Sequence, residues 1–202
     1  MSPQHHLDVS RETLDRLRAF ADLVTRWTAK INLVSKPSVP ELWERHIVDS
    51  AQLFALAGPW SNWVDLGSGG GFPGLVIACM AADNDTDRQV TLVESDQRKS
   101  AFLRSAIREL TLPAKVIAKR IEAIEPLNAD ILSARALTDL DGLLGYAEQH
   151  LTPTGIALFP KGANWKSEDA AARKQWSYHC EAITSKTNPD AAVLKIKEIV
   201  RV

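Results

Sequence analysis

Val64-Asp65-Leu66-Gly67-Ser68-Gly69-Gly70-Gly71-Phe72-Pro73 is the stretch that decides the fold of this chain of 202 residues. Its first residues continue an apolar run that predicts the end of a buried strand, and Pro73 suits the first turn of a helix. Between them, glycines let the backbone approach a ligand closely, and the free N–H groups of the helix start favour anionic or hydroxyl-bearing ligands. The stretch therefore predicts a cradle for a polar ligand.

The glycine spacing indicates which ligand this cradle holds. The pattern is Asp-x-Gly-x-Gly-x-Gly, whereas the dinucleotide pattern Gly-x-Gly-x-x-Gly would place its third glycine at position 72. Phe72 stands there instead. The spacing favours S-adenosylmethionine (AdoMet) over a nicotinamide cofactor, and an NAD(P) oxidoreductase remains the disfavoured alternative.

Composition sets limits on the class of protein. Hydrophobic residues make up 45% of the chain and charged residues 24%, as in an ordinary globular protein. Because the net charge is −1, any nucleic-acid surface must be a local patch. The chain shows no signal-peptide pattern, no apolar run near the ~20 residues of a membrane span and no zinc-type Cys/His spacing. We therefore expect a cytoplasmic protein with no membrane contact and no metal site.

The predicted secondary structure changes near residue 58, from helices alone to alternating strands and helices. Before it, Ser10 can cap a first helix, and a second helix is expected from about Pro40 to Ala57. After it, short apolar runs alternate with helical patterns. Strands are expected at 62–66, 89–94, 114–118, 129–134, 155–160, 178–186 and 191–200, and helices at 73–82, 96–110, 139–150 and 165–177.

This alternation predicts βαβ units and a parallel sheet, and the last two strands, with no helix between them, predict an antiparallel hairpin at one edge. The fold class is therefore α/β: a class I AdoMet-dependent methyltransferase, Rossmann-like, with a seven-stranded mostly parallel sheet covered by helices on both faces. We expect an N-terminal helical extension over residues 1–58, packed on an AdoMet-binding methyltransferase domain over residues 59–202.

Candidate cofactor residues follow the strand ends, because ligands of such sheets lie at the carboxyl ends of the strands. Glu94 could accept hydrogen bonds from a ribose diol, or it could cap the following helix. Ile121 and Glu122 could flank an adenine ring, or they could simply begin a helix. The remaining candidates belong to the glycine stretch: Asp65, Gly67, Gly69, Gly71 and Phe72.

The methyl acceptor is expected beside Ser133-Ala134-Arg135-Ala136, at the end of the fourth strand. This segment lacks the Asn/Asp-Pro-Pro-aromatic tetrad of many amine methyltransferases, and no cysteine lies near it for cytosine-C5 chemistry. An acceptor that is already nucleophilic, such as guanine N7, fits best. Arg135 could hold guanine O6 or a phosphate, contact the cofactor carboxylate, or form a structural ion pair.

Six motifs together resemble the bacterial 16S rRNA guanine-N7 methyltransferases, the glucose-inhibited division protein B family. They cover nearly the whole chain in order: Asn32-Leu33-Val34-Ser35, Arg45-His46-Ile47-Val48-Asp49-Ser50, Asp65 to Gly74, Arg120-Ile121-Glu122, Ser133-Ala134-Arg135-Ala136 and Lys161-Gly162. Many members carry an arginine before the last strand, where this chain has Ala191-Ala192, so Lys195 or Lys197 is a candidate replacement.

The resemblance implies an AdoMet enzyme that methylates a guanine in the 530 loop of 16S rRNA, as naked rRNA or in the 30S ribosomal subunit. It implies cofactor contacts at Gly67, Phe72, Ile121, Glu122 and Arg135. An AdoMet methyltransferase with another substrate, and a non-catalytic AdoMet- and RNA-binding module, remain alternatives. From the residues themselves, Arg45 and Asp49 could pair with each other at i, i+4, and His46 is interpreted as a packed or capping residue.

Local charge supports an RNA substrate. From Arg98 to Arg120 the chain has seven Lys/Arg residues and one acid, whereas residues 83–97 have five acids and one arginine. Such a patch suits a phosphate backbone, although a solvated helix face has the same composition. The candidate substrate-binding residues are Arg98, Lys99, Arg104, Arg120 and Lys161.

Overall fold

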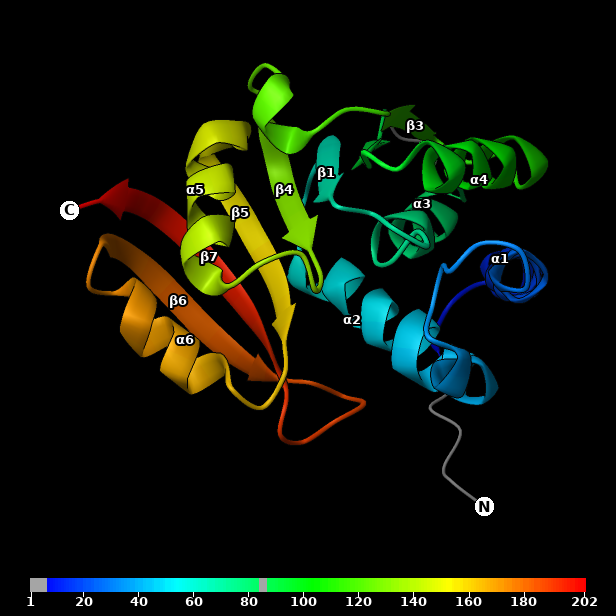
Figure 1. Cartoon of the computed structure of the whole chain (residues 1–202), viewed down its shortest axis with the longest axis horizontal. Coiled ribbons are helices and arrows are strands. Elements are labelled where there is room, and N and C mark those ends of the chain that lie inside the picture. The colour runs from blue at the N-terminus through cyan, green and yellow to red at the C-terminus, as the bar shows by residue number, and fades with distance from the viewer. Residues whose placement is uncertain (1–6, 84–86) are drawn as a thin grey trace.

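A seven-stranded sheet forms the middle layer of the computed structural model, which describes residues 7–83 and 87–202 (Figure 1). The strand order is β3-β2-β1-β4-β5-β7-β6, parallel from β3 to β5, with β7 antiparallel to both of its neighbours. The strands are β1 Asn62–Leu66, β2 Gln89–Val93, β3 Ala114–Ile117, β4 Ala129–Ala134, β5 Leu151–Lys161, β6 Trp176–Thr184 and β7 Ala192–Arg201. The predicted α/β class and the late antiparallel hairpin are confirmed.

Helices cover both faces of this sheet (Figure 1). One face carries α1 Arg11–Thr28, α2 Asp49–Leu56, α3 Gly74–Ala81 and α4 Gln97–Glu109. The other carries η3 Ile121–Ala123, α5 Leu140–His150 and α6 Trp165–Ala172. Because β1 to β5 are parallel, their carboxyl ends meet at one edge of the sheet, here called the carboxyl edge, and the opposite edge is called the amino edge.

Three predicted boundaries differ from the structure. The helix expected from Pro40 to Ala57 is a succession of a 3-10 segment, η1 Lys36–Glu41, a π-helical segment, η2 Trp43–Val48, and α2. The helix expected at 165–177 ends at Ala172, because Trp176 is buried in β6 and donates its indole N–H to Asp141 at 2.7 Å.

The third difference is β5, which starts at Leu151 rather than at residue 155. Leu151 pairs with Ala129 of β4, and the register then shifts before Ile156 pairs with Ile131. Gly155 lies at this irregularity, where an added Cβ would come 2.7 Å from the carbonyl oxygen of Ala129. Close approach of the two backbones explains an irregular start that alternation alone does not reveal.

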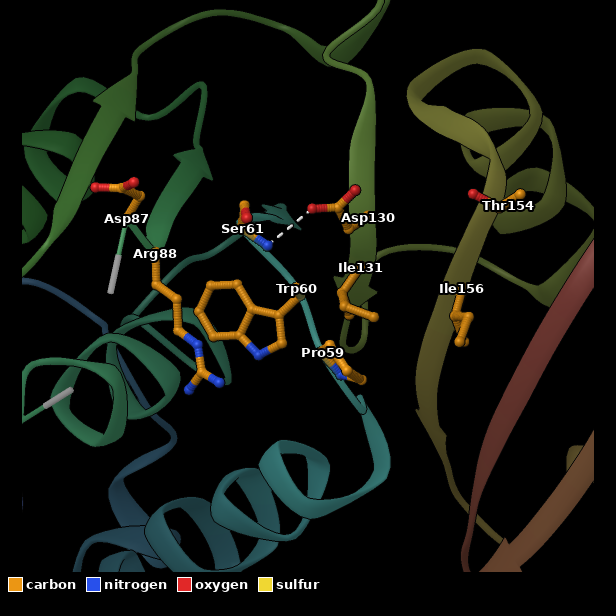
Figure 2. Close-up of a pocket in the computed structure, with 9 residues that line it drawn as sticks. All are labelled: Pro59, Trp60, Ser61, Asp87, Arg88, Asp130, Ile131, Thr154 and Ile156. Atoms are coloured by element: carbon orange, nitrogen blue, oxygen red, sulfur yellow. Dashed lines mark hydrogen bonds between the residues drawn. The ribbon is translucent and has the colours of Figure 1, made fainter. Parts of the chain in front are cut away.

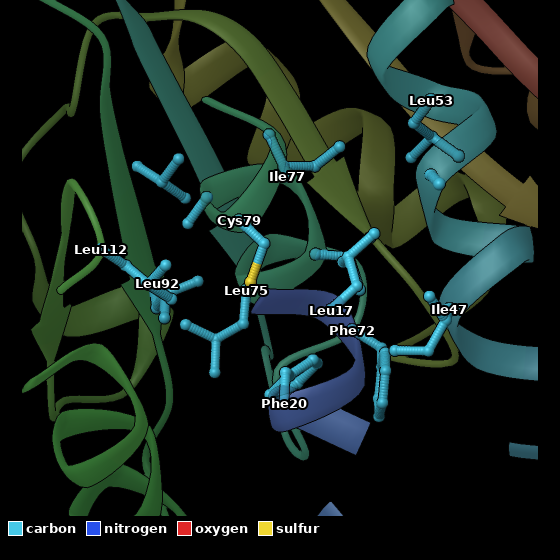
Figure 3. Close-up of a cluster of buried hydrophobic side chains, with 14 of the residues drawn as sticks. Leu17, Phe20, Ile47, Leu53, Phe72, Leu75, Ile77, Cys79, Leu92 and Leu112 are labelled. Atoms are coloured by element: carbon cyan, nitrogen blue, oxygen red, sulfur yellow. The ribbon is translucent and has the colours of Figure 1, made fainter. Parts of the chain in front are cut away.

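The N-terminal helices share a hydrophobic core with the sheet. Figure 3 shows Leu17 and Phe20 of α1 near Phe72 and Leu75, with Ile47 on the opposite side of Phe72 from Leu17. The rings of Phe20 and Phe72 lie 5.3 Å apart, so α1 packs directly against the glycine stretch. The helical segment therefore contributes to the wall around the ligand cradle, while the division at residue 58 stays a prediction.

Asp83, after α3, anchors the start of α1. Its carboxylate accepts hydrogen bonds from the hydroxyls of Ser10 and Thr13 and pairs with Arg16 at 2.8 Å. These partners lower the pKa of Asp83 to about 2, the Ser10 hydroxyl being the largest cause. We expect Asp83→Ala to lower the free energy of unfolding by about 1–3 kcal/mol in urea denaturation at pH 7.

Asp15 provides the matched control for this prediction, since it lies on α1 and forms only exposed pairs with Arg11 and Arg18, at 3.9 and 3.6 Å. Asp15→Ala should change stability by less than about 0.5 kcal/mol. Because the pKa of Asp83 is depressed in the folded state, its contribution should be lost as the pH falls from about 4 towards 2. Equal effects of the two substitutions would contradict the anchoring role.

His150, at the end of α5, is buried in the core with 0% exposure. Neither of its ring nitrogens has a hydrogen-bond partner in the described part of the chain, and burial lowers its pKa. Because the unfolded chain binds the proton more readily, the imidazole destabilises the fold increasingly as the pH falls through about 6.5. His150→Leu should therefore raise the midpoint of urea unfolding at pH 7 and raise it further at pH 5.5; a gain that is no larger at pH 5.5 would contradict this.

Candidate functional site

The glycine loop lies at the carboxyl edge, between β1 and α3. Gly67, Gly69 and Gly71 have φ angles of +65°, +53° and +90°, which side-chain-bearing residues rarely adopt. A Cβ at Gly71 would lie 2.7 Å from Leu75, whereas a Cβ at Gly69 would have only the carbonyl oxygen of Gly67 nearby, at 3.7 Å. The loop is therefore tightly packed at Gly71 and open at Gly69.

Glu94 at the end of β2 holds this open part of the loop. One carboxylate oxygen accepts the Gly69 N–H and the other accepts the Asp96 N–H, both at 2.8 Å. The helix cap that sequence reasoning left open for Glu94 is instead Asp96, which accepts the N–H groups of Arg98 and Lys99. Each Glu94 oxygen keeps further acceptor capacity, so the carboxylate can still receive hydroxyl groups.

Asp65 lies beneath the loop with 0% exposure. Its carboxylate accepts the Ser133 hydroxyl at 2.8 Å and the Gly74 N–H at 3.2 Å, and the Ser133 oxygen in turn accepts the Trp63 indole N–H at 2.8 Å. Burial raises the pKa of Asp65 to about 6 despite these hydrogen bonds. Asp65 thus joins β1, β4 and the start of α3 beneath the loop.

Ile121 and Glu122 follow β3 in η3, across β2 from the loop. Ile121 is 7% exposed, whereas Glu122 is exposed and its carboxylate accepts the Tyr146 hydroxyl at 2.5 Å. This hydrogen bond is the largest cause that lowers the pKa of Glu122. The pair combines an apolar surface with a fixed carboxylate, which suits an adenine ring and its amino group.

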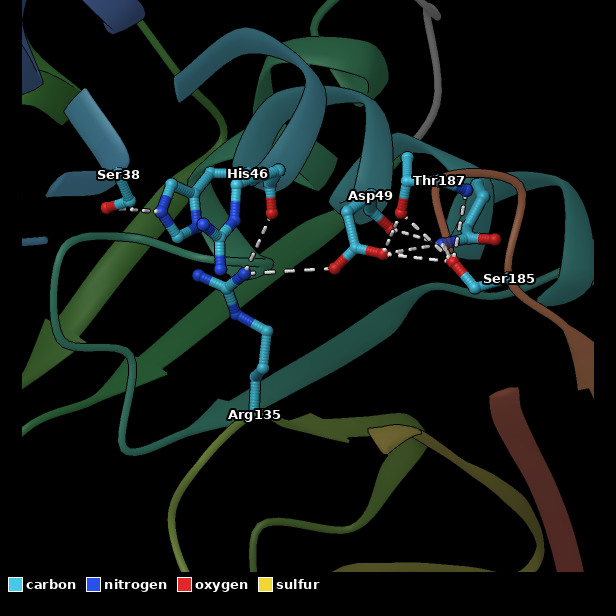
Figure 4. A network of polar contacts seen from close by, with 8 residues as sticks. Ser38, His46, Asp49, Arg135, Ser185 and Thr187 are labelled. Carbon is cyan, nitrogen blue, oxygen red and sulfur yellow. Dashed lines mark hydrogen bonds and ion pairs between the residues drawn. The ribbon is translucent and has the colours of Figure 1, made fainter. Parts of the chain in front are cut away.

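Arg135 meets the N-terminal helices at the end of β4 (Figure 4). Its guanidinium lies 5.3 Å from the centre of the Phe72 ring, 3.7 Å from the Asp49 carboxylate and 3.3 Å from the Arg45 carbonyl oxygen. Phe72 itself is 4% exposed. The predicted pair of Arg45 and Asp49 is wrong: Arg45 pairs with Glu41 at 3.2 Å, leaving Asp49 for Arg135.

His46 completes this cluster, and sequence reasoning gave it only a packing or capping role. Its ring lies 5.0 Å from that of Phe72, and Nε2 lies within hydrogen-bond distance of the Ser38 hydroxyl, at 3.2 Å. Burial, followed by the charges of Arg135 and Arg45, lowers the pKa of His46 to about 4. The imidazole is therefore neutral at pH 7, and the cluster carries no third positive charge.

Asp49 connects the cluster to the β6–β7 loop, residues 185–191, a contact that sequence reasoning missed. Its Oδ1 accepts hydrogen bonds from Gln52 at 2.9 Å, Ser185 at 3.3 Å and Thr187 at 2.9 Å (Figure 4). The Lys186 N–H also donates to the Gln52 side chain at 3.0 Å. Because Ser185 and Thr187 lie more than 130 positions from Asp49 in sequence, no local pattern points to them.

A cavity of about 880 Å³ opens beside this cluster at the carboxyl edge. Its walls come from η1, η2, α2, the ends of β4 and β5, and the β6–β7 loop. The charged lining residues are Glu41, Glu44, Arg45, Asp49, Arg135, Lys161 and Glu168. Four acids and three bases line the cavity, so it suits a polar ring with both donors and acceptors rather than a bare phosphate.

The predicted substrate residues fall into two groups. Arg98, Arg104 and Arg120 are exposed and Lys99 is partly exposed, on α4 and just after β3. Lys161 lies away from them, because β5 and β3 stand on opposite sides of β1 in the sheet order. It lines the cavity and pairs with Glu168 at 2.5 Å.

A second cavity of about 470 Å³ lies at the amino edge (Figure 2). Its lining includes Trp60 and Arg88, whose guanidinium lies 5.0 Å from the centre of the indole ring, and Asp130. It is separated from the glycine loop by the length of the strands. Within residues 7–83 and 87–202, no cluster of His, Cys, Asp or Glu could hold a metal ion, and no helix could cross a membrane.

The residues at the carboxyl edge fit AdoMet. The open space over Gly69 accepts a ligand that approaches the backbone, the Glu94 carboxylate can accept two hydroxyls, and Ile121 with Glu122 suits an adenine. Together these features match a ligand that combines a polar chain, a ribose and an adenine, as AdoMet does.

Comparison with known proteins agrees with this geometry. The family model for GidB, described as rRNA small subunit methyltransferase G, matches residues 13–193. A ribosomal RNA small subunit methyltransferase G of Ruegeria pomeroyi is 60% identical over 97% of this chain and 96% of its own length. One of Cereibacter sphaeroides is 51% identical over 97% and 96%.

Solved structures show the same fold at low sequence identity. A TehB-like SAM-dependent methyltransferase from Corynebacterium glutamicum has a TM-score of 0.59 at 14% identity, covering 91% of this chain and 98% of that one. M. jannaschii TYW2 in complex with AdoMet has a TM-score of 0.60 at 16% identity, covering 87% and 80%. The chain is an AdoMet-dependent methyltransferase that belongs to the GidB family of small-subunit rRNA methyltransferases.

Proposed function

We propose that the chain transfers the methyl group of AdoMet to N7 of a guanine in the 530 loop of 16S rRNA, in the cytoplasm. Membership of a small-subunit rRNA methyltransferase family supports the substrate class. The observation that carries the proposal is the ion pair of Arg135 and Asp49 in the lining of the 880 Å³ cavity, with Arg135 5.3 Å from the ring of Phe72 in the glycine stretch.

The chemistry needs little more than alignment. When bound, AdoMet supplies a methyl carbon on a cationic sulfur: the N7 lone pair forms the new N–C bond, the C–S bond breaks with its electron pair left on sulfur, and the positive charge passes to the guanine. No proton leaves N7 beforehand, so the site needs no general base. The residues around the cavity therefore serve to orient the ring and to stabilise its charge.

The cofactor residues have distinct proposed roles. Gly67, Gly69 and Gly71 shape the loop around the ligand, and Glu94 receives the ribose hydroxyls while it holds Gly69. Ile121 and Glu122 hold the adenine, with Tyr146 fixing the carboxylate. Asp65 and Phe72 contribute from below, Asp65 by supporting the loop and Phe72 by giving Arg135 a surface to stack on.

The RNA would contact the protein in two regions. The exposed basic residues Arg98, Lys99, Arg104 and Arg120 suit the phosphate backbone, whose contacts fix position and make binding salt-dependent. Arg135 would hold guanine O6, and Lys161 shapes the cavity wall through Glu168. This division places sequence-independent contacts outside the cavity and base contacts inside it.

A labelling assay tests the proposed substrate. We expect labelled methyl to pass from AdoMet to small ribosomal subunits, or to naked 16S rRNA, taken from cells that lack the modification. Reversing the charges of Arg98, Lys99 and Arg104 together should weaken RNA binding and flatten its dependence on salt, without changing AdoMet affinity. Label in protein or in a small molecule, with no need for RNA, would reject the proposal, and binding of both ligands without turnover would indicate a non-catalytic module.

A further inference from the structure

We propose that Oδ2 of Asp49 is a catalytic hydrogen-bond acceptor, which receives the exocyclic amine of the target guanine and stabilises the positive charge that the ring gains. This inference rests on guanine N7 being the acceptor. It assigns a base-reading role to a residue of η2–α2, on the N-terminal helices rather than on the methyltransferase sheet.

The two oxygens of the Asp49 carboxylate have different surroundings. Oδ1 accepts hydrogen bonds from Gln52, Ser185 and Thr187, so the plane of the carboxylate is fixed. Oδ2 has the Arg135 guanidinium at 3.7 Å, which is an ion-pair distance but too long for a hydrogen bond. The side chain is 18% exposed and lines the cavity. The carboxylate is therefore oriented through Oδ1, and the residue lines the space where the base would lie.

Methyl transfer strengthens a hydrogen bond from the guanine amine to this oxygen. Before the reaction the guanine ring is neutral, and afterwards it is a cation whose Watson–Crick N–H groups are more acidic. A hydrogen bond from the amine to a carboxylate therefore becomes stronger as the N7–C bond forms. Such an interaction lowers the barrier rather than merely tightening substrate binding. Arg135 at the same end of the cavity can hold O6, so one ion pair would read both sides of the guanine edge.

Two of the other three carboxylates that line the cavity, Glu41 and Glu168, are less suited to this role. Glu41 is exposed and pairs with Arg45 across one helical turn, so its position is not fixed. Glu168 is occupied by Lys161 at 2.5 Å and by the Leu140 N–H at 3.0 Å, through the same oxygen, Oε2. Asp49 combines a carboxylate that is anchored through one oxygen with a place in the cavity lining.

The first test is Asp49→Asn. The donor amide of Gln52 keeps the asparagine oxygen at the Oδ1 position, so the new NH₂ group would stand at Oδ2 and oppose the guanine amine. We expect kcat for methyl transfer to fall about 100-fold, while AdoMet affinity and Tm stay within twofold and about 3 °C of the wild type. Asp15→Asn, which removes a carboxylate charge on α1 outside the cavity, is the control and should retain activity within about threefold.

The second test separates contact with the base from a structural effect. Small subunits are reconstituted with 16S rRNA that carries inosine, which lacks the exocyclic amine, at the target position. Any intrinsic difference in N7 reactivity affects both enzymes equally and cancels in the comparison. We expect the guanosine-to-inosine ratio of kcat to be at least fivefold smaller in Asp49→Asn than in the wild type. An unchanged ratio, or full activity of Asp49→Asn, would overturn the inference.

The product of the wild-type reaction distinguishes a failure of the proposed function from a failure of the role of Asp49. If the wild type does not form 7-methylguanosine, the proposed function itself fails. If it does, and Asp49→Asn still shows an unchanged base ratio, only the role of Asp49 fails.

Discussion

Gly69→Val is expected to raise the dissociation constant for AdoMet at least 100-fold in isothermal titration calorimetry, while the protein stays folded. Gly69 has φ +53°, and its Cβ would project into open space, with only the Gly67 carbonyl oxygen within 4 Å. A valine would fill the space that the ligand needs and would also distort the N–H that donates to Glu94 at 2.8 Å. The left-handed backbone adds a cost to stability of about 1–2 kcal/mol.

Gly58→Val is the matched control, because it carries the same backbone penalty at a different place. Gly58 has φ +70° and no atom within 4 Å of an added Cβ, and it precedes β1 at the amino edge. It should lower Tm about as much as Gly69→Val, by roughly 2–8 °C, and leave AdoMet affinity unchanged. Equal AdoMet affinity in the two variants would contradict the placement of the cofactor over the glycine loop.

Arg135→Ala is expected to reduce kcat/KM for methyl transfer about 10–100-fold, with a much smaller effect on thermal stability. The guanidinium stacks on Phe72 and pairs with Asp49, so its loss removes both a base contact and the partner of a cavity carboxylate. A good arginine–guanine contact is worth about 1–3 kcal/mol, which sets this range. Arg135→Lys should recover only part of the activity, since lysine keeps the charge but not the planar stacking.

Arg201→Ala controls for the loss of a stacked arginine. Its guanidinium lies 5.4 Å from the centre of the Trp176 ring, close to the 5.3 Å between Arg135 and Phe72. Arg201 ends β7 near the amino edge, because the other end of β7, at Ala192, pairs with the end of β5. We expect a similar small loss of Tm and unchanged methyl transfer. Comparable loss of activity in both variants would remove Arg135 from the site.

The sequence was sufficient to predict the sheet and its ligand edge, because both depend on local signals. Alternation of strands and helices predicts the parallel sheet, and the glycine spacing around Phe72 predicts the cradle. Ser10 as a helix cap and the antiparallel end of the sheet are confirmed. These features are determined by residues within one element or by the order of neighbouring elements along the chain.

The contacts around Arg135 could not be predicted in this way. Its partners come from η2, α2 and the glycine stretch, and Asp49 links it to the β6–β7 loop, so packing alone decides which residues meet. The i, i+4 spacing of Arg45 and Asp49 favours a local pair, but the partly buried Arg135 pairs with Asp49, and Arg45 pairs with Glu41 instead. Likewise, the neutral state of His46 depends on burial and on two arginines, one of them remote in sequence.

The position of the transferred methyl group identifies the acceptor atom. Small ribosomal subunits lacking the modification are incubated with the protein and methyl-labelled AdoMet, and the 16S rRNA is then digested to nucleosides and separated. We predict that the label is recovered as 7-methylguanosine and maps to one guanine of the 530 loop. Label recovered as a nucleoside methylated at an exocyclic amine, at a ring carbon or at the ribose would contradict the account.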